Sequence, residues 1–423
     1  MKINKPKNSY LVPLLVVMSL MFFWNLTRNI NDVLIPHLKR ACQLTDLQSS
    51  LVQSAFFGAY FLLALPAGHF INKYGYKAGM VAGLAFAAFG AALFYPAAET
   101  RFYPVFLGAL FIMASGFTFL EVTATPYISK LGDEHSASSR LSLSAAAGSV
   151  GATIAPYVGS LLLLHKEDIA ESTILGMDSS QLDKFLESEA NMVKLPYLTL
   201  AALFALVAIL VFSLKLPSIK DEQNSTPHSI RETLKFRHTS FGVLAVFAYV
   251  GAEVGIVSFM IRYSKSLHIE GLTEQKAAIF ISVFMGLVLV GRIAGAWVLK
   301  NFNPQKMLLI SASGAFILVS AAMFFNSYTS LWLFATIGFF TSIMYPIIFT
   351  LSIRDLGSYT RSASSVLILG IVGGAIVPPI MGFISDHSGI LWSFILPLIC
   401  YAYVVFFAVN GSRISQSDHS PVI

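Results

Sequence analysis

The chain has 423 residues, of which 56% are hydrophobic and only 12% are charged. Soluble domains carry about 25% charged residues, so this composition excludes a soluble globular protein and indicates many membrane spans. The formal net charge of +6 fits Lys and Arg residues that hold loops on the cytoplasmic side, and no nucleic-acid partner is expected.

Apolar windows separated by charged or Pro/Gly-marked breaks predict twelve spans, each near the roughly 20 residues that a helix needs to cross a bilayer. The basic segment 1–10 leads into an uncharged run at 11–26, which is longer than a signal-peptide core and predicts a retained first helix. In chain order the predicted spans are 10–36, 48–71, 78–98, 102–129, 140–164, 192–216, 239–264, 274–298, 304–326, 328–352, 360–384 and 389–410.

Twelve spans place both chain ends on one side of the membrane. Loops and span ends on that side carry seventeen Lys and Arg residues, against nine on the opposite side. This excess predicts that both termini are cytoplasmic. The polar stretch 217–238 falls midway, so we expect an N-terminal six-helix domain at 1–216, a cytoplasmic linker at 217–238 and a C-terminal six-helix domain at 239–423.

The two predicted halves resemble each other in sequence. Residues 148–156 (GSVGATIAP) in span 5 match 370–378 (GIVGGAIVP) in span 11, and 54–58 (SAFFG) in span 2 match 282–286 (SVFMG) in span 8. Proline also interrupts spans 4 and 10, at Pro126 and Pro346. Two parallel six-helix repeats are a transporter arrangement, with the substrate site between them near the bilayer midplane. Small residues in these repeats also have a purely structural reading, as close helix packing.

Ionisable residues inside spans are costly and usually face a cavity or a partner. The candidates here are Arg28, Asp32, Glu121, Glu253 and Arg292. A carboxyl group in a low dielectric holds a proton near neutral pH and releases it when water enters, which is the chemistry of a proton-coupled carrier. The structural alternatives are a wet helix end for Asp32, an inert hydrogen-bonded acid for Glu121 and a snorkelling side chain for Arg292. For Glu253 the two readings are balanced.

The polar groups of span 1 suit a sugar. Asn29 and Asp32 are three residues apart on one helical face, and Asn29, Asn31 and the carboxylates are groups that sugar hydroxyls would bind. Arg28 lies four residues before Asp32, where the two side chains could pair and keep Asp32 ionised.

Motifs for other chemistry are missing from the sequence. It contains no Walker phosphate-binding loop and no His-Glu-x-x-His, and no Gly-x-Ser-x-Gly nucleophile elbow. We therefore expect no enzyme, no bound metal and no cofactor, with the proton as the coupling ion.

Several motifs together resemble the major facilitator superfamily, and within it the fucose–galactose–glucose:proton symporters, nearly end to end. The loop 68–77 (GHFINKYGYK) is a degenerate form of the superfamily signature, with Asn72 in place of the acid. The more specific matches are 29–36 (NINDVLIP), 53–58 (QSAFFG), 120–126 (LEVTATP), 249–253 (YVGAE) and Tyr345-Pro346.

This resemblance implies the major facilitator fold of twelve transmembrane helices in two six-helix pseudo-repeats. It also implies proton coupling and sugar binding at Asp32 and Glu121, and a sugar contact at Asn29. We add Asn31 and Glu253 as expected sugar contacts. Fucose permeases carry Gln where this chain has Glu253, and in that respect the chain is more similar to the glucose/galactose members. They also carry amide side chains on span 5, where this chain has Ala145 and Gly148.

The resulting hypothesis is a proton-coupled importer of a monosaccharide, L-fucose or a glucose/galactose-type hexose. We expect it to work by alternating access as a monomer in the cytoplasmic (inner) membrane, in contact with the lipid bilayer. The alternative is a drug:proton antiporter, because Gly151, Pro156 and Gly159 resemble the glycine–proline motif of antiporter span 5. A sugar sensor is a third possibility, but the tail at 412–423 is short for an output domain.

Overall fold

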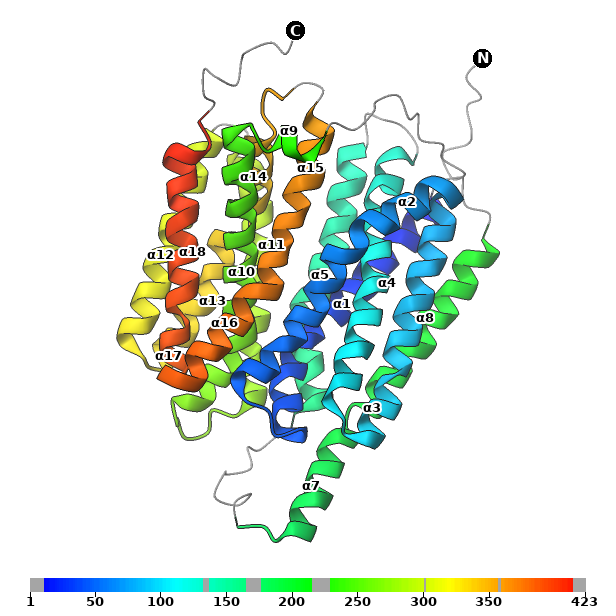
Figure 1. The fold of residues 1–423 in the computed structure, drawn as a ribbon, viewed down its shortest axis with the longest axis vertical. Helices are drawn as coiled ribbons and strands as arrows, with labels where there is room; N and C mark the ends of the chain where they lie inside the picture. Colours follow the sequence, from blue (N-terminus) through cyan, green and yellow to red (C-terminus); the bar gives the residue numbers. More distant parts are fainter. Residues whose placement is uncertain are drawn as a thin grey trace. The chain divides into compact units, whose positions relative to one another are not determined.

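The computed structural model describes residues 11–131, 137–164, 176–214, 229–299, 302–356 and 359–413. Within these residues, twelve helical segments are long and apolar enough to cross a membrane, and Figure 1 shows the helices along the chain. The predicted all-helical membrane fold with twelve spans is confirmed. The largest boundary difference is at the start of span 6, which runs over Ser179–Ser213, and span 1 runs over Val12–Ala41.

The chain divides into two compact units, and helix α2 belongs to both. Unit 1 comprises Met1–Gln43 and Gly58–Gln223, and unit 2 comprises Leu44–Phe57 and Asn224–Ile423. The predicted domain limits remain a proposal, and of the predicted linker, 217–228 lies outside the described residues.

Unit 1 contains the first group of spans. Its helices are α1 (Leu11–Ala41), α2 from Gly58 onward (α2 as a whole is Asp46–Ala92), α3 (Phe94–Thr100), α4 (Tyr103–Lys130), α5 (Ala137–Leu163), α7 (Ser179–Asn191) and α8 (Lys194–Ser213). Helix α2 holds two spans because Gly75 has a φ of +86°, a conformation open to glycine and costly for other residues. This glycine ends one span and turns the chain into the next.

Unit 2 contains the second group of spans. Its helices are α9 (Ile230–Thr233), α10 (Arg237–Ser266), α11 (Glu274–Val298), α12 (Pro304–Phe325), α13 (Tyr328–Thr341), α14 (Met344–Ser352), α15 (Thr360–Leu369), η4 (Gly370–Val372), α16 (Gly373–Ser388), α17 (Ile390–Ser393), α18 (Ile395–Phe406) and η5 (Phe407–Gly411).

Proline acts differently in spans 4 and 10. Span 10 breaks into α13 and α14 just before Pro346, whose ring removes an N–H and clashes with the carbonyl four residues earlier. The predicted interruption at Pro126 is wrong, because α4 continues as one helix to Lys130. A proline in a membrane helix is tolerated where neighbouring groups satisfy the freed backbone carbonyl.

The repeated glycines make the same close helix crossing in each unit. A Cβ added to Gly151 of α5 would lie 2.5 Å from the carbonyl oxygen of Phe22 in α1. A Cβ added to Gly373 of α16 would overlap the carbonyl oxygen of Phe247 in α10. Only glycine allows backbones to approach this closely. The matching crossings support the repeat seen in the sequence and the packing interpretation of its small residues.

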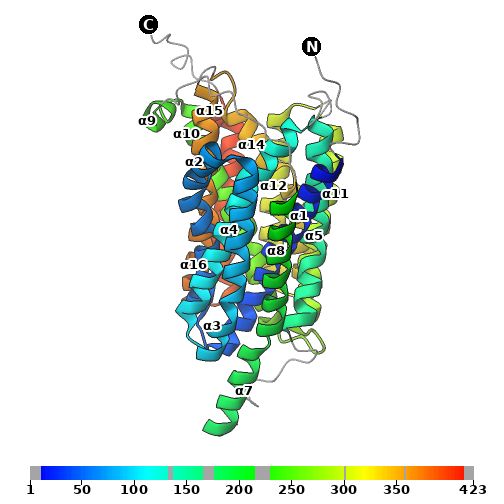
Figure 2. The ribbon, with the colours of Figure 1, turned by 90° about the vertical axis from the view of Figure 1, so that its right-hand side faces the viewer.

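Helix α7 is a feature that the sequence analysis missed. It continues into α8 at the end of unit 1 near α3, as Figure 2 shows. Asp178 accepts a hydrogen bond from the Gln181 backbone N–H at 2.7 Å, and the Gln181 side chain accepts one from the Asp178 N–H at 3.2 Å. This reciprocal capping box was the available sequence signal.

A buried carboxylate attaches α7 to α1. Glu189 is fully buried, with its Oε2 3.2 Å from Arg40 Nε and 3.7 Å from His37 Nδ1. At the exposed edge, Arg101 Nη2 lies 2.6 Å from Asp183 Oδ1. A buried charge is stable only with such partners. They give the last turns of α1 a fixed position.

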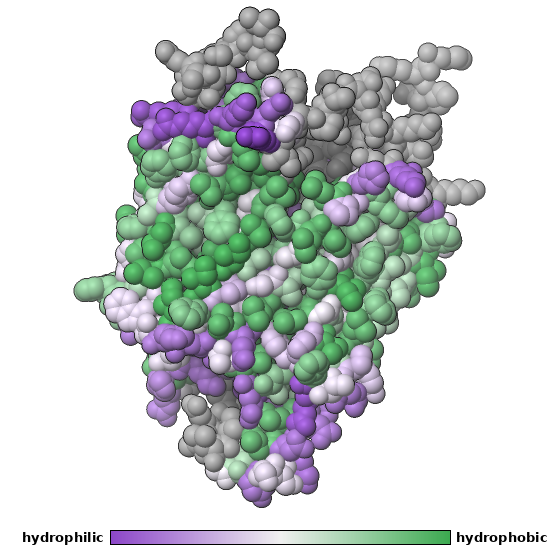
Figure 3. All heavy atoms as spheres, viewed as in Figure 1, coloured by the Kyte–Doolittle hydropathy of each residue, from purple (hydrophilic) through white to green (hydrophobic). Residues whose placement is uncertain are grey.

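The surface fits a bilayer. On the face drawn in Figure 3, hydrophobic side chains cover the middle of the helices and hydrophilic ones gather near the helix ends. Large apolar residues such as Phe324 and Leu195 are 84% and 75% exposed, which is favourable only against lipid.

Substitution at the paired glycines should destabilise the protein. Gly151→Val and Gly373→Val force a side chain against a backbone carbonyl, and overpacking of this kind costs about 1–3 kcal/mol. We expect both variants to unfold at a lower temperature than the parent in detergent. Gly108→Val is the matched control, because nothing lies within 4 Å of a Cβ added there. Equal unfolding temperatures for all three variants would contradict the crossing.

Candidate functional site

The polar run of span 1 lies inside a helix and not at its end. Helix α1 extends to Ala41, nine residues past Asp32, so its length of about 46 Å exceeds the roughly 30 Å hydrocarbon thickness. Asp32 is only 8% exposed. The predicted span end at residue 36 is therefore wrong, because α1 continues through Pro36. Asp32 is therefore a buried side chain within a continuing helix, and its place at the centre or the wet end of the span stays a prediction.

The two asparagines of the run differ in their hydrogen bonds. Asn29 Nδ2 donates to the carbonyl oxygen of Asn25 at 2.8 Å. The amide atoms of Asn31, both Oδ1 and Nδ2, are buried without a hydrogen-bond partner among the described residues. Such atoms are costly in a protein interior unless a ligand or water binds them. Asn31 therefore keeps both of its amide atoms available for a ligand.

Glu121 lies in a polar cluster of unit 1. Its carboxylate is beside the Tyr60 hydroxyl of α2 and close enough to Arg28 of α1 for the opposite charges to attract. The Arg28 Cζ lies 5.8 Å from the centre of the Tyr60 ring, and the Trp24 indole is beside the Tyr60 hydroxyl. Three helices thus bring an acid, a phenol and a guanidinium together.

This arrangement changes the expectation for Arg28. The spacing along α1 suggested Asp32 as the partner of Arg28, and the fold also brings Glu121 of α4 within reach. Tyr60 had no sequence signal, because it lies in an apolar stretch of α2. Arg28 is thus close enough to the second predicted coupling carboxylate for the opposite charges to attract, and Tyr60 joins the candidate site.

Unit 2 holds a comparable group around Glu253. The Tyr249 hydroxyl, one turn earlier on α10, lies beside the Glu253 carboxylate, with Arg292 of α11 and Tyr401 of α18 close enough to act electrostatically. The Tyr249 ring centre is 6.3 Å from that of Tyr345 in α14. Each unit therefore carries a carboxylate with tyrosine and arginine neighbours.

Among the residues that the structure describes, no group of three or more His, Cys, Asp or Glu side chains is arranged to hold a metal ion. The polar chemistry near the predicted site residues consists of carboxylates, amides, phenols and guanidinium groups. The carboxylates can exchange protons, and all four kinds of group can hydrogen-bond to hydroxyl-rich ligands.

Comparison with known proteins identifies relatives over almost the whole length. The model of the Major Facilitator Superfamily matches residues 17–371. The glucose/galactose transporter of Brucella abortus is 41% identical over 395 residues, covering 93% of this chain and 92% of the relative. The L-fucose-proton symporter of Escherichia coli is 38% identical, covering 95% of this chain and 93% of the relative. A crystal structure of the transporter FucP in the outward conformation superposes with a TM-score of 0.70 at 37% identity, covering 96% of this chain and all of that one.

The electrostatic attraction between Arg28 and Glu121 can be measured by a double-mutant cycle. Arg28→Gln leaves the Glu121 carboxylate without this cation, so it should destabilise the protein more when Glu121 is present than in a Glu121→Gln background. Contacting charges couple by about 0.5–3 kcal/mol, and thermal unfolding of the four proteins in detergent measures this coupling.

The control cycle uses Arg354 and Asp355, whose Nε and Oδ2 atoms lie 3.8 Å apart on an exposed surface. Exposed pairs contribute little, so their coupling should be near zero. Equal coupling in the two cycles would show that Arg28 does not stabilise Glu121.

Proposed function

Because this chain belongs to the Major Facilitator Superfamily, and within it to the fucose–galactose–glucose:proton symporters, we propose that it imports a monosaccharide together with a proton by alternating access. The chain is a transporter and not an enzyme. The observation that carries the proposal is the identity of 41% and 38% to sugar transporters along more than nine-tenths of the chain.

We assign proton coupling to Asp32 and Glu121. Both are carboxylates inside spans, where an ionised group costs free energy to bury and protonation removes that cost. In the proposed cycle Asp32 takes a proton from outside, sugar binds, the protein turns inward, and proton and sugar leave. Glu121 relays the protonation change to the sugar site, and Arg28 supplies its positive neighbour while the proton is absent.

We assign sugar binding to Asn29, Asn31, Asp32, Glu121 and Glu253. The unsatisfied amide of Asn31 supports this role, because a hydroxyl can accept from its Nδ2 and donate to its Oδ1. A carboxylate at Glu253 can only accept hydrogen bonds while ionised, so it would select sugars that present a hydroxyl at that point. A monosaccharide is the partner that these groups fit.

The drug:proton antiporter is less well supported. The sequence argument for an antiporter used Gly151, Pro156 and Gly159. Gly151, however, lies at a close helix crossing, and Gly373 lies at the matching crossing of unit 2, so packing explains this glycine. The relatives matched along the full length are named as sugar transporters. For location, we propose the bacterial inner membrane, with both termini cytoplasmic and the monomer as the working form. No cofactor other than the transported proton is proposed.

Transport by purified protein in liposomes tests the coupling residues. An inward proton gradient should drive sugar accumulation, with protons entering alongside the sugar. Asp32→Asn and Glu121→Gln should abolish uphill accumulation, and at least one of them should retain sugar exchange in counterflow, because binding and movement survive when only the proton step is lost. The counterflow panel contains L-fucose, glucose, galactose, mannose and N-acetylglucosamine.

Glu187→Gln is the control for this experiment, because Glu187 is an exposed acid on α7 and its loss should leave accumulation unchanged. Normal accumulation by both site variants would refute the assignment of Asp32 and Glu121. Sugar uptake without proton entry in the parent would refute symport itself.

Glu253→Gln tests sugar selection separately. The change keeps the size of the side chain and replaces an acceptor-only group by an amide that also donates. We expect the KM for glucose and galactose to rise relative to that for L-fucose, with uphill accumulation retained. Initial rates for each sugar give this ratio, and Glu270→Gln, at an exposed position of the same unit, should leave it unchanged. An unaltered ratio in Glu253→Gln would remove Glu253 from the sugar site.

A further inference from the structure

The first glycine of the repeated motif has different neighbours in the two units. In unit 2, a Cβ added to Gly370 would lie 2.7 Å from the Val243 carbonyl oxygen, so close backbone packing requires this glycine. In unit 1, a Cβ added to Gly148 would lie 2.7 Å from Nδ2 of the Asn25 side chain, and the nearest backbone atom, the Met21 carbonyl oxygen, would be 3.5 Å away. The backbone crossing therefore leaves room for a Cβ at position 148, and the glycine makes room for the amide of Asn25.

Asn25 lies on the polar stripe of α1. Asn29 follows it by four residues and Asp32 by seven, and residues at this spacing share one face of a helix. At the helical rise of 1.5 Å per residue, Asn25 is about 6 Å from Asn29 and about 10 Å from Asp32 along the axis. Asn25 is half-buried, whereas Asn29 and Asp32 are buried. Asn25 thus extends the proposed sugar-binding face of α1 by one turn, at a more accessible position.

The side chain of Asn25 is held in the same way as that of Asn29. Asn25 Nδ2 donates to the Met21 carbonyl oxygen, and Asn29 Nδ2 donates to the Asn25 carbonyl oxygen, both at 2.8 Å. An amide side chain has two N–H donors and an acceptor oxygen, so this bond uses one donor and fixes the orientation of the group. Within the described part of the chain, Asn25 Oδ1 accepts no hydrogen bond. The second N–H and the oxygen of Asn25 therefore remain for a ligand.

The α5 surface beside Asn25 consists of small residues. Ala145 precedes Gly148 by three residues, on the same side of α5, and it is exposed. Neither residue has a side chain long enough to cover the Asn25 amide. The amide therefore lies at the edge of the crossing between α1 and α5, where a polar group keeps access to a ligand.

We propose that Asn25 is a further sugar contact, which hydrogen-bonds a hydroxyl of the transported monosaccharide from α1, at the place where Gly148 leaves α5 without a side chain. The inference rests on the proposed function, because it extends the sugar site assigned to Asn29 and Asp32. An amide can both donate to and accept from sugar hydroxyls. It does not titrate, so Asn25 acts in sugar recognition and not in proton coupling.

Moving the amide from α1 to α5 tests the contact in proteoliposomes. Asn25→Ala should raise the KM for the best transported sugar of the panel by roughly three- to tenfold, the value of one neutral hydrogen bond, with the maximal rate and uphill accumulation retained. In this background Gly148→Asn places an amide in the vacated space, because the side chain that its Cβ would meet is gone. The KM should then return toward the parent value. Gly148→Ala in the same background is the matched control, because it fills space without a hydrogen-bonding group and should leave the KM raised.

The outcomes separate recognition from packing. An unchanged KM in Asn25→Ala would overturn the contact. Restoration by Gly148→Ala as complete as that by Gly148→Asn would also overturn it, because Asn25 would then only fill space between α1 and α5. If the parent protein transported no sugar of the panel, the proposed function itself would be refuted, and this inference with it.

Protection from a thiol reagent tests the contact without transport. In a Cys42→Ser/Cys400→Ala background, which removes both native thiols, Asn25→Cys should react with a small methanethiosulfonate in detergent, and saturating sugar should slow the reaction. Ser188→Cys, at an exposed position of α7, is the control and should react at the same rate with and without sugar. An Asn25→Cys rate that saturating sugar leaves unchanged would overturn the contact.

Discussion

The close approach of helix backbones at glycine is the constraint on which both units depend. In unit 1, α5 contacts α1 at Gly151, and in unit 2, α16 contacts α10 at Gly373. A side chain at either position would separate helices that carry the polar groups of the candidate site. The glycines therefore affect the candidate site indirectly, because they set the distance between the helices that carry Asp32 and Glu253 and the helices packed against them.

Carboxylates in the described residues also have basic side chains as partners. Glu189 is bound by Arg40, Asp46 by Arg262, and Glu121 attracts Arg28. A buried charge without a partner costs several kcal/mol, so a helix that carries one is held to the helix that carries its partner. Changing the protonation of one carboxylate weakens a contact between helices. That physical link is what a coupled transporter needs.

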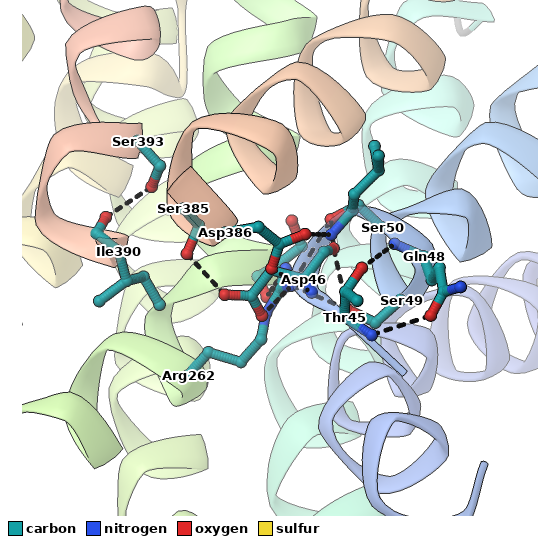
Figure 4. Close-up of polar contacts among 12 residues, drawn as sticks. Thr45, Asp46, Gln48, Ser49, Ser50, Arg262, Ser385, Asp386, Ile390 and Ser393 are labelled. Carbon is teal, nitrogen blue, oxygen red and sulfur yellow. Dashed lines mark hydrogen bonds and ion pairs between the residues drawn. The ribbon is translucent and has the colours of Figure 1, made fainter. Parts of the chain in front are cut away.

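The polar groups nevertheless fall into two kinds. The Asp46 carboxylate accepts from Arg262 of α10 and from Ser385 of α16, and Asp386 accepts from the Asp46 N–H at the start of α2 (Figure 4). These bonds suit a contact that holds a segment in place. Glu121 and Glu253 have tyrosine and arginine neighbours, and the buried amide of Asn31 has no partner among the described side chains and backbone. A site that must exchange protons and ligands benefits from this incomplete satisfaction.

The sequence by itself determined the number and order of the spans, because about twenty apolar residues are needed for each crossing. It also showed the duplication and the rare carboxylates inside spans, because a charged residue is easily recognised within an apolar run. Only the tertiary structure decided which side chains meet. Tyr60 and Glu121 are far apart in sequence and adjacent in space, and spacing along α1 could not indicate that Arg28 approaches α4. Local periodicity describes one helix at a time, whereas the candidate site is formed where separate helices cross.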